Sequence, residues 1–242
     1  MVREFGGKAR FVVENYGDSE IARRFGVTRY PAIFVNDVLV AKPKDFGFYG
    51  KGEGSDNGRY TPWKNAESHE RFRSDLRKMI ELVLAGKQSS LAEESKANQT
   101  ENTDEIAALP TLQISDLSGQ QIDPKDLANH AVVVEFWATW CPPCRGTLAW
   151  LGKLKQQYGD KLVVLSIAIE SEEKDVRQIA TNMNLPFYWM MGSPEIAKKF
   201  GDISSVPTLF LFDRNGKTAK IFYGAPNDLH QNAEAAITQL LK

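Results

Sequence analysis

The amino-acid sequence predicts an α/β fold in which helices cover both faces of a sheet. Two nearly continuous apolar runs, AVVVEFWA (131–138) and KLVVLSIAIE (161–170), are typical of strands buried on both faces. A segment with helical periodicity follows each run, at 141–159 and at 171–184. Because strands alternate with helices along the chain, a layered α/β architecture is favoured.

The first 86 residues predict a smaller unit that precedes this pattern. Its expected elements, in order, are a strand at 9–16, a short helix at 19–26, two strands at 31–37 and 38–42, a glycine-rich loop at 46–63 and a helix at 68–86. The five aromatic residues of the loop are expected either to pack onto the unit or to form a peptide-binding or dimer surface. They are Phe46, Phe48, Tyr49, Tyr60 and Trp63.

A change in composition separates the two parts of the chain. Residues 87–108 are polar, carry more acidic than basic side chains and hold few aromatic or β-branched residues. Such a segment buries too little apolar surface to fold alone, and it predicts a flexible linker. We therefore expect domains at 1–86 and 109–242.

The second domain has further predicted elements at its two ends. A β-hairpin is expected at 109–123, and the pair PTLFLFD and TAKIFYG predicts another around the turn at 214–217. SPEIAKKFG predicts a helix with Ser193 as N-cap and Pro194 in its first turn. A terminal helix is expected at 227–242.

Composition excludes several classes of protein. The formal net charge of −1 gives no general attraction to nucleic acid or to an anionic membrane. No apolar run approaches the ~18 residues of a transmembrane helix. The N-terminus lacks the apolar core of a secretory signal, so either the protein is cytosolic or a targeting segment is missing.

The chain has two cysteines, Cys141 and Cys144. Two are too few for a disulfide-stapled scaffold or for a four-thiolate zinc site. The histidines His69, His130 and His230 show no ligand spacing, so we expect no metal site, and a copper chaperone is disfavoured for the same reason.

The stretch EFWATWCPPCR carries the chemistry. Its Cys-x-x-Cys motif leaves a buried strand and opens a helix, where unpaired backbone N–H groups and the helix dipole favour an anion. The pKa of Cys141 is therefore expected to fall below the ~8.5 of free cysteine. Cys144 lies within the first helical turn, near enough to close a disulfide.

Residues 109–242 resemble the TlpA/ResA-like branch of the thioredoxin-fold thiol–disulfide oxidoreductases. The resemblance rests on an ordered set of features: the leading hairpin, WCPPC, the extra helix-bearing segment after KLVVLSIAIE, and VPT before the last strand pair. It implies a thioredoxin-like fold, with a central mixed sheet flanked by helices.

The resemblance also implies roles for individual residues. Cys141 is implied as the exposed nucleophile and Cys144 as the buried resolving thiol. Glu135 occupies the place of a buried carboxyl that moves a proton to or from Cys144, although a solvent-facing Glu135 at a strand edge is the alternative. Some members have an acid where this chain has Thr147, and no lysine partner for Glu135 is evident.

A second group of residues is implied to bind substrate. Pro207 matches the cis-proline that faces the disulfide, a trans proline at an edge strand being the alternative. It would leave the backbone of Val206 open to an extended substrate. Trp140 would form an aromatic wall beside Cys141, and Pro142 lies within the motif, whereas Trp137 is expected in the core.

One part of the sequence nearly repeats another. SEIARRFGVTRYP (19–31) and PEIAKKFGDISSVP (194–207) share a helix signature and a proline before an apolar strand. Residues 1–86 are therefore expected to be an incomplete thioredoxin-like module without redox cysteines and without a central strand; chance similarity is the alternative. A shortened chain or misplaced start is favoured over direct pairing of the flanking strands or insertion of another segment.

The sequence therefore predicts a thiol–disulfide oxidoreductase that exchanges dithiols and disulfides with protein substrates through Cys141 and Cys144. The resemblance favours a reductant in an extracytoplasmic or periplasmic compartment, with the cytoplasm left open, and it implies an unidentified donor or acceptor protein. No cofactor, nucleic acid or membrane segment is expected. The alternatives are a disulfide oxidase or isomerase and a non-redox binding or chaperone module.

Overall fold

The computed structural model describes residues 1–14, 19–27, 29–49, 58–90, 106–112, 114–201 and 203–242. The chain divides into two compact units, Met1–Asp104 and Glu105–Lys242.

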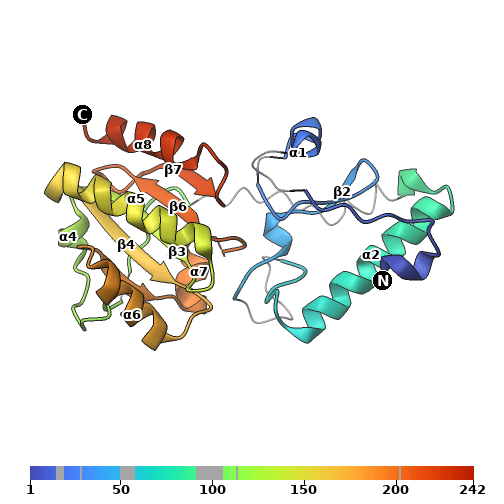
Figure 1. Cartoon of the computed structure of the whole chain (residues 1–242), viewed down its shortest axis with the longest axis horizontal. Coiled ribbons are helices and arrows are strands. Elements are labelled where there is room, and N and C mark those ends of the chain that lie inside the picture. The colour runs from blue at the N-terminus through green and yellow to red at the C-terminus, as the bar shows by residue number, and fades with distance from the viewer. Residues whose placement is uncertain (15–18, 28, 50–57, 91–105, 113, 202) are drawn as a thin grey trace. The chain divides into compact units, whose positions relative to one another are not determined.

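The second unit is built around a five-stranded mixed sheet (Figure 1). Its strands are β3 (Ala131–Trp137), β4 (Leu162–Ala168), β5 (Tyr188–Met191), β6 (Thr208–Phe212) and β7 (Thr218–Tyr223). Its helices are α4 (Pro124–Leu127), α5 (Pro142–Tyr158), the 3-10 turn η3 (Gly159–Lys161), α6 (Glu173–Met183), α7 (Pro194–Lys199) and α8 (Leu229–Leu240). The strand order is β5-β4-β3-β6-β7. Strand β3 is parallel to β4 and antiparallel to β6, so it lies at the centre of the sheet.

One face of the sheet packs against α5, α6 and α8. Successive side chains of a strand point to opposite faces. Val133 and Trp137 of β3 therefore share a face, and both join a buried cluster with Leu148 of α5, Val176 of α6 and Ile237 of α8. This cluster also contains both cysteines, so the redox motif is anchored in the main core.

The opposite face of the sheet packs against α7. The ring of Phe136 lies 4.9 Å from that of Phe200, which ends α7, and 5.9 Å from that of Phe210 on β6. The predicted N-cap of α7 is confirmed, because the Ser193 side chain accepts a hydrogen bond from the Ile196 N–H. Helices on both faces of a mixed sheet confirm the predicted α/β, thioredoxin-like fold class.

Two features of the second unit differ from the prediction. Strand β5, formed by YWMM, was not predicted, because a short apolar run between a proline and a glycine has no clear period. Among its described residues, the leading hairpin predicted at 109–123 shows one bridge, between Ser115 and Gln121. The Asp116 carboxylate accepts hydrogen bonds from the turn, and the Leu117 N–H, within that turn, donates to the Trp189 carbonyl of β5.

Part of the predicted linker is held by the second unit. Residues 91–105 of it lie outside the described residues. Ala108 forms a bridge with Lys217, and the Thr218 N–H donates to the Ala107 carbonyl. Contacts with the second unit are therefore present a few residues before the predicted boundary at 109.

The first unit contains a two-stranded sheet and one long helix. Its elements are η1 (Val2–Phe5), α1 (Glu20–Arg24), β1 (Ile33–Val35), β2 (Val38–Ala41), η2 (Pro43–Asp45) and α2 (Ala66–Leu84). Both predicted helices and the predicted strand pair are confirmed. Val35, Val40, Met79 and Ile80 form a small buried cluster between the strand pair and α2.

The strand expected at 9–16 is wrong for the residues that the structure describes. Residues 9–14 have no regular secondary structure and belong to no ladder, and Phe11 and Val13 are 70% and 76% exposed. A strand needs a neighbour to satisfy its N–H and C=O groups. The described part of this unit offers no third strand to pair with, so β-propensity alone does not form one.

The aromatic residues of the glycine-rich loop mostly pack inward. Phe46 and Tyr60 are buried, and with Trp63 they surround Phe72 of α2 at ring distances of 5.0 to 5.7 Å. The Tyr60 hydroxyl donates to Asp75. These contacts favour the packing interpretation of the loop; residues 50–57 of it lie outside the described residues.

Candidate active site

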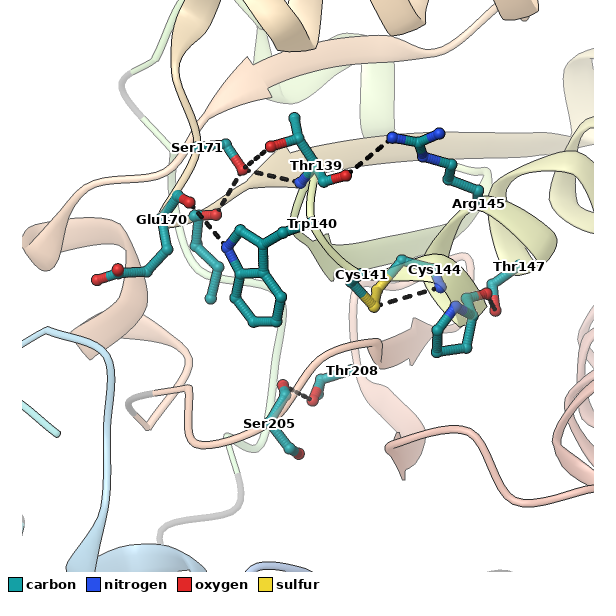
Figure 2. The surroundings of a disulfide bond; sticks show 12 residues. Thr139, Trp140, Cys141, Cys144, Arg145, Thr147, Glu170, Ser171, Ser205 and Thr208 are labelled. Atoms are coloured by element: carbon teal, nitrogen blue, oxygen red, sulfur yellow. Dashed lines mark hydrogen bonds between the residues drawn. A yellow bond between two sulfur atoms is a disulfide. The ribbon is translucent and has the colours of Figure 1, made fainter. Parts of the chain in front are cut away.

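The two cysteines lie where the central strand passes into a helix. Strand β3 ends at Trp137, and α5 starts at Pro142 with Cys141 as its N-cap. Cys141 and Cys144 form a disulfide with an S–S distance of 2.03 Å and a Cα–Cα distance of 5.4 Å. Figure 2 shows this disulfide at the start of α5, with Trp140 on one side and Thr147 on the next helical turn.

The first turn of α5 supplies a hydrogen-bond donor to Cys141. The Cys144 N–H donates to the Cys141 Sγ at 3.3 Å (Figure 2). This N–H has no partner four residues earlier in the helix, so it and the helix dipole favour negative charge on the sulfur. The arrangement can therefore stabilise a Cys141 thiolate when the disulfide is reduced.

The exposure of the two cysteines differs less than the resemblance implies. Cys144 is fully buried as expected, but Cys141 is only 4% exposed. The expectation of an openly exposed Cys141 is wrong for this disulfide form. The reason is packing, because Cys141 belongs to the main core cluster, against which Val206 also packs.

Glu135 lies inside the core below the motif. It is 0% exposed, opposite Ser166 of β4 and Leu209 of β6, so the alternative of a solvent-facing Glu135 is wrong. The alternation of β3 places it on the same face as Val133 and Trp137, the face that holds the cysteine cluster. Neither carboxyl oxygen has a hydrogen-bond partner among the described residues. Burial therefore raises the pKa of Glu135 well above its usual range.

A loop after β4 holds the residues that precede Cys141. The Thr139 N–H and hydroxyl both hydrogen-bond to Ser171 Oγ, at 2.9 and 3.2 Å, and Ser171 donates to the Ile169 carbonyl. The Trp140 indole N–H donates to the Glu170 carbonyl at 3.0 Å (Figure 2). Trp140 nevertheless remains 50% exposed, so it offers an aromatic surface whose orientation is set.

The proline before β6 has the geometry that the resemblance implies. The Val206–Pro207 peptide bond is cis. Pro207 is buried, whereas Val206 is half-buried and packs against the cluster that contains both cysteines. The Thr208 hydroxyl donates to the Ser205 carbonyl at 2.8 Å and ties the two ends of this segment together (Figure 2).

The remaining predicted residues take different positions. Pro142 is exposed at the start of α5. Trp137 is fully buried, as expected of a core residue. Among the described residues, no group of three or more His, Cys, Asp and Glu side chains could hold a metal ion, and none of the described helices is long and apolar enough to cross a membrane.

Sequence reasoning missed Ser171 and His230. Ser171 follows β4, whose end lies beside the end of β3 because the two strands are parallel. That shared edge could have indicated its contact with Thr139. His230 reaches Thr147 from 83 residues away on α8, a contact for which no local pattern gives a signal.

Comparisons with known proteins agree with this geometry. Residues 103–237 match the Redoxin family. The thioredoxin-like protein YneN of Bacillus subtilis is 32% identical over 118 residues, which cover 48% of this chain and 69% of YneN. The thiol-disulfide oxidoreductase ResA of Bacillus cereus is 30% identical over 152 residues, which cover 62% of this chain and 87% of ResA.

A solved structure shows the same fold. The thiol:disulfide interchange protein of Chlorobium tepidum, a thioredoxin family protein, aligns over 59% of this chain and 100% of its own length, with a TM-score of 0.51 and 22% identity. The family match spans more than half of the chain, and it includes β3, the CPPC motif and the Val206–Pro207 segment. The chain therefore belongs to the Redoxin family, and its C-terminal half is a thioredoxin-fold protein of the TlpA/ResA-like thiol–disulfide oxidoreductases.

Proposed function

We propose that this thiol–disulfide oxidoreductase reduces disulfide bonds of other proteins through Cys141 and Cys144. One observation carries the proposal: the two cysteines form a disulfide at the N-terminus of α5, with the Cys144 N–H directed at the Cys141 sulfur. The resemblance to the TlpA/ResA-like branch supports the reducing direction. No cofactor is required, because the electrons come from the dithiol itself.

The proposed reaction has two exchange steps. The Cys141 thiolate attacks one sulfur of a substrate disulfide, which breaks that S–S bond and releases one substrate thiolate. The Cys144 thiolate then attacks Cys141 Sγ in the mixed disulfide and releases the second substrate sulfur. The substrate gains two electrons and two protons, and the chain ends with the Cys141–Cys144 disulfide.

Glu135 is proposed to move the proton of the resolving thiol. Cys144 is fully buried, so its proton cannot pass directly to bulk water. The Glu135 carboxyl lies on the same face of β3 as the cysteine cluster, and burial raises its pKa, so it holds a proton more readily than an exposed glutamate does. In its carboxylate form it would accept the Cys144 proton before the second exchange step.

The substrate is proposed to lie against Trp140, Pro142, Val206 and Pro207. Trp140 and Pro142 are exposed beside Cys141, and the half-buried Val206 packs against the cysteine cluster. The Val206 backbone would pair with an extended substrate segment while Trp140 contacts its side chains.

The direct test is a stoichiometric exchange. The fully reduced chain is mixed with oxidised insulin, samples are quenched in acid, and free thiols are alkylated and counted by mass spectrometry. We expect one disulfide to form in the chain for each disulfide lost from insulin. Insulin thiols that appear without oxidation of Cys141 and Cys144 would contradict the proposal.

Trp140→Ala is expected to weaken the use of protein substrates. Truncating a half-exposed aromatic residue in a binding surface costs on the order of 1–2 kcal/mol, so kcat/KM for insulin should fall about tenfold. The rate with hydroxyethyl disulfide, which is too small to span this surface, should change little. Equal losses with both substrates would mean that Trp140 supports the cysteines and does not bind substrate.

The first unit is proposed to be an incomplete thioredoxin-like module, at about residues 1–86. Helix α1 matches α7 in its cap, because Ser19 accepts from the Ala22 N–H as Ser193 does from the Ile196 N–H. Each helix is followed by an antiparallel strand pair, β1–β2 or β6–β7. Residues 87–108 are proposed to link the two modules.

An extracytoplasmic location, with a dithiol protein as electron donor, is proposed from the family resemblance. Thiol trapping in intact cells checks the donor: the cysteine pair should be mostly reduced at steady state. A Cys141–Cys144 pair that stays oxidised would contradict the proposal that a donor protein supplies it with electrons.

A further inference from the structure

A chain of hydrogen bonds runs from α8 to the sulfur of Cys141. His230 Nε2 lies 3.3 Å from Thr147 Oγ1, and the Thr147 hydroxyl donates to the Pro143 carbonyl at 3.2 Å. Pro143 and Cys144 share one peptide group, whose N–H donates to Cys141 Sγ at 3.3 Å. Figure 2 shows the last of these bonds, with Thr147 on the following turn of α5.

The direction of each bond follows from the atoms present. A hydroxyl has one proton, and a carbonyl oxygen only accepts, so Thr147 must give its proton to Pro143. Thr147 can then only accept from His230, which requires the proton on His230 Nε2. All bonds therefore point the same way, from the imidazole to the sulfur.

Bonds that point the same way strengthen one another. A carbonyl that accepts a hydrogen bond polarises its peptide group, which makes the N–H of the same group a better donor; such effects amount to roughly 10–30% per bond. A thiolate is a stronger acceptor than a disulfide sulfur, because hydrogen bonds to ionised groups are stronger. The chain of bonds therefore favours the thiolate of Cys141 over its thiol.

The imidazole is held in place for this task. The His230 ring stacks on the Trp150 ring at 4.7 Å, with 8° between the planes. The Trp150 indole N–H donates to Glu234 Oε2 at 3.3 Å, so the stack is fixed from both helices. Burial lowers the pKa of His230, which keeps the ring neutral near pH 7 with a single proton for Thr147.

We propose that Thr147 and His230 are positioning residues that stabilise the Cys141 thiolate through the Pro143–Cys144 peptide group. The inference rests on the proposed function only in taking Cys141 as the nucleophile. It assigns a role to Thr147, whose hydroxyl accepts a hydrogen bond from the His230 imidazole and acts on Cys141 through the backbone.

The test measures the thiolate of Cys141 directly. Reduced protein is alkylated with iodoacetamide between pH 4 and pH 10, and mass spectrometry follows the modification of Cys141. Thr147→Val removes the hydroxyl while keeping the side-chain shape, and Thr147→Ser is the matched control that keeps it. Thr147→Val is expected to raise the midpoint of the pH profile and to slow alkylation about threefold below that midpoint. Thr147→Ser should leave both unchanged.

Substitutions at His230 provide an independent test of the inference. His230→Leu should raise the midpoint in the same direction, and His230→Gln, whose amide can still donate, should restore most of it. In the double variant His230→Leu adds nothing to Thr147→Val, because the chain of bonds is already broken. This arm also keeps the inference testable if Thr147→Val fails to fold.

Either of two outcomes would overturn the inference: a midpoint unchanged in His230→Leu, or a His230→Leu effect that is undiminished in the Thr147→Val background. Failure of the proposed function would look different. The wild-type chain would then show the predicted alkylation profile but would not reduce insulin.

Discussion

Cys141→Ser is expected to abolish disulfide reduction, whereas Cys144→Ser is expected to capture substrates. Without the Cys141 thiolate no attack on the substrate disulfide occurs, so the rate of insulin reduction should fall to that of the buffer. Without Cys144 the first exchange still takes place, but the mixed disulfide at Cys141 is not resolved. Non-reducing electrophoresis with mass identification should show a covalent adduct in Cys144→Ser and none in Cys141→Ser.

The same pair of variants separates the rival functions. If Cys144 carried out the first attack, the adduct would appear in Cys141→Ser instead, and the assignment of roles would be reversed. If Cys141→Ser trapped nothing yet suppressed aggregation of an unfolded protein as well as the wild type, a binding or chaperone function would be favoured. A Cys141→Ser variant with normal reduction rates would contradict the exchange mechanism.

Glu135→Leu is expected to stabilise the fold and to slow the reaction. The carboxyl is fully buried and has no hydrogen-bond partner among the described residues, so its removal should raise the free energy of unfolding by about 1–3 kcal/mol. If it moves the Cys144 proton, its loss should slow insulin reduction at pH 7 about a hundredfold. Urea unfolding and the exchange assay measure the two effects on the same sample.

The buried Glu135 carboxyl also predicts how the free energy of unfolding changes with pH. The pKa of Glu135 is raised in the folded state, so above its ordinary value of 4.5 the folded chain keeps a proton that the unfolded chain has lost. This contribution to stability is fully present below pH 4.5 and is lost as pH rises through the folded pKa, by up to about 1.4 kcal/mol per pH unit.

Two variants isolate this contribution. Glu135→Leu and Glu135→Gln should both lose the slope, whereas only Glu135→Leu should also gain stability, since Gln keeps a buried polar group. An unchanged slope in both variants would show that another group titrates.

The second unit could largely be predicted because its central strands β3 and β4 are long and buried on both faces. The runs at 131–138 and 161–170 have no polar alternation, which marks central strands without knowledge of the fold. Strand β5 was missed because four residues do not establish a period. The strand predicted at 9–16 is wrong for its described residues. Its β-propensity is high, but the described part of the first unit gives it no neighbouring strand.

The site was predictable only as far as it is local in sequence. Cys141, Cys144 and the first turn of α5 lie within one short motif, so their chemistry follows from spacing. The sequence pointed to Glu135 but left its burial open, because that burial depends on β4 and β6, which lie on either side of it. His230 could not be predicted, because its contact with Thr147 depends on how α8 packs against α5.

The reduction potential of the Cys141–Cys144 pair tests the central claim most directly. The protein is equilibrated in glutathione or dithiothreitol buffers of defined ratio, thiols are trapped in acid, and the oxidised fraction is read by mass. A potential near or below that of thioredoxin, ~−270 mV, is the predicted result for a reductant. A value near ~−120 mV would make the protein an oxidant, and a pair that forms no disulfide in any buffer would contradict the redox function itself.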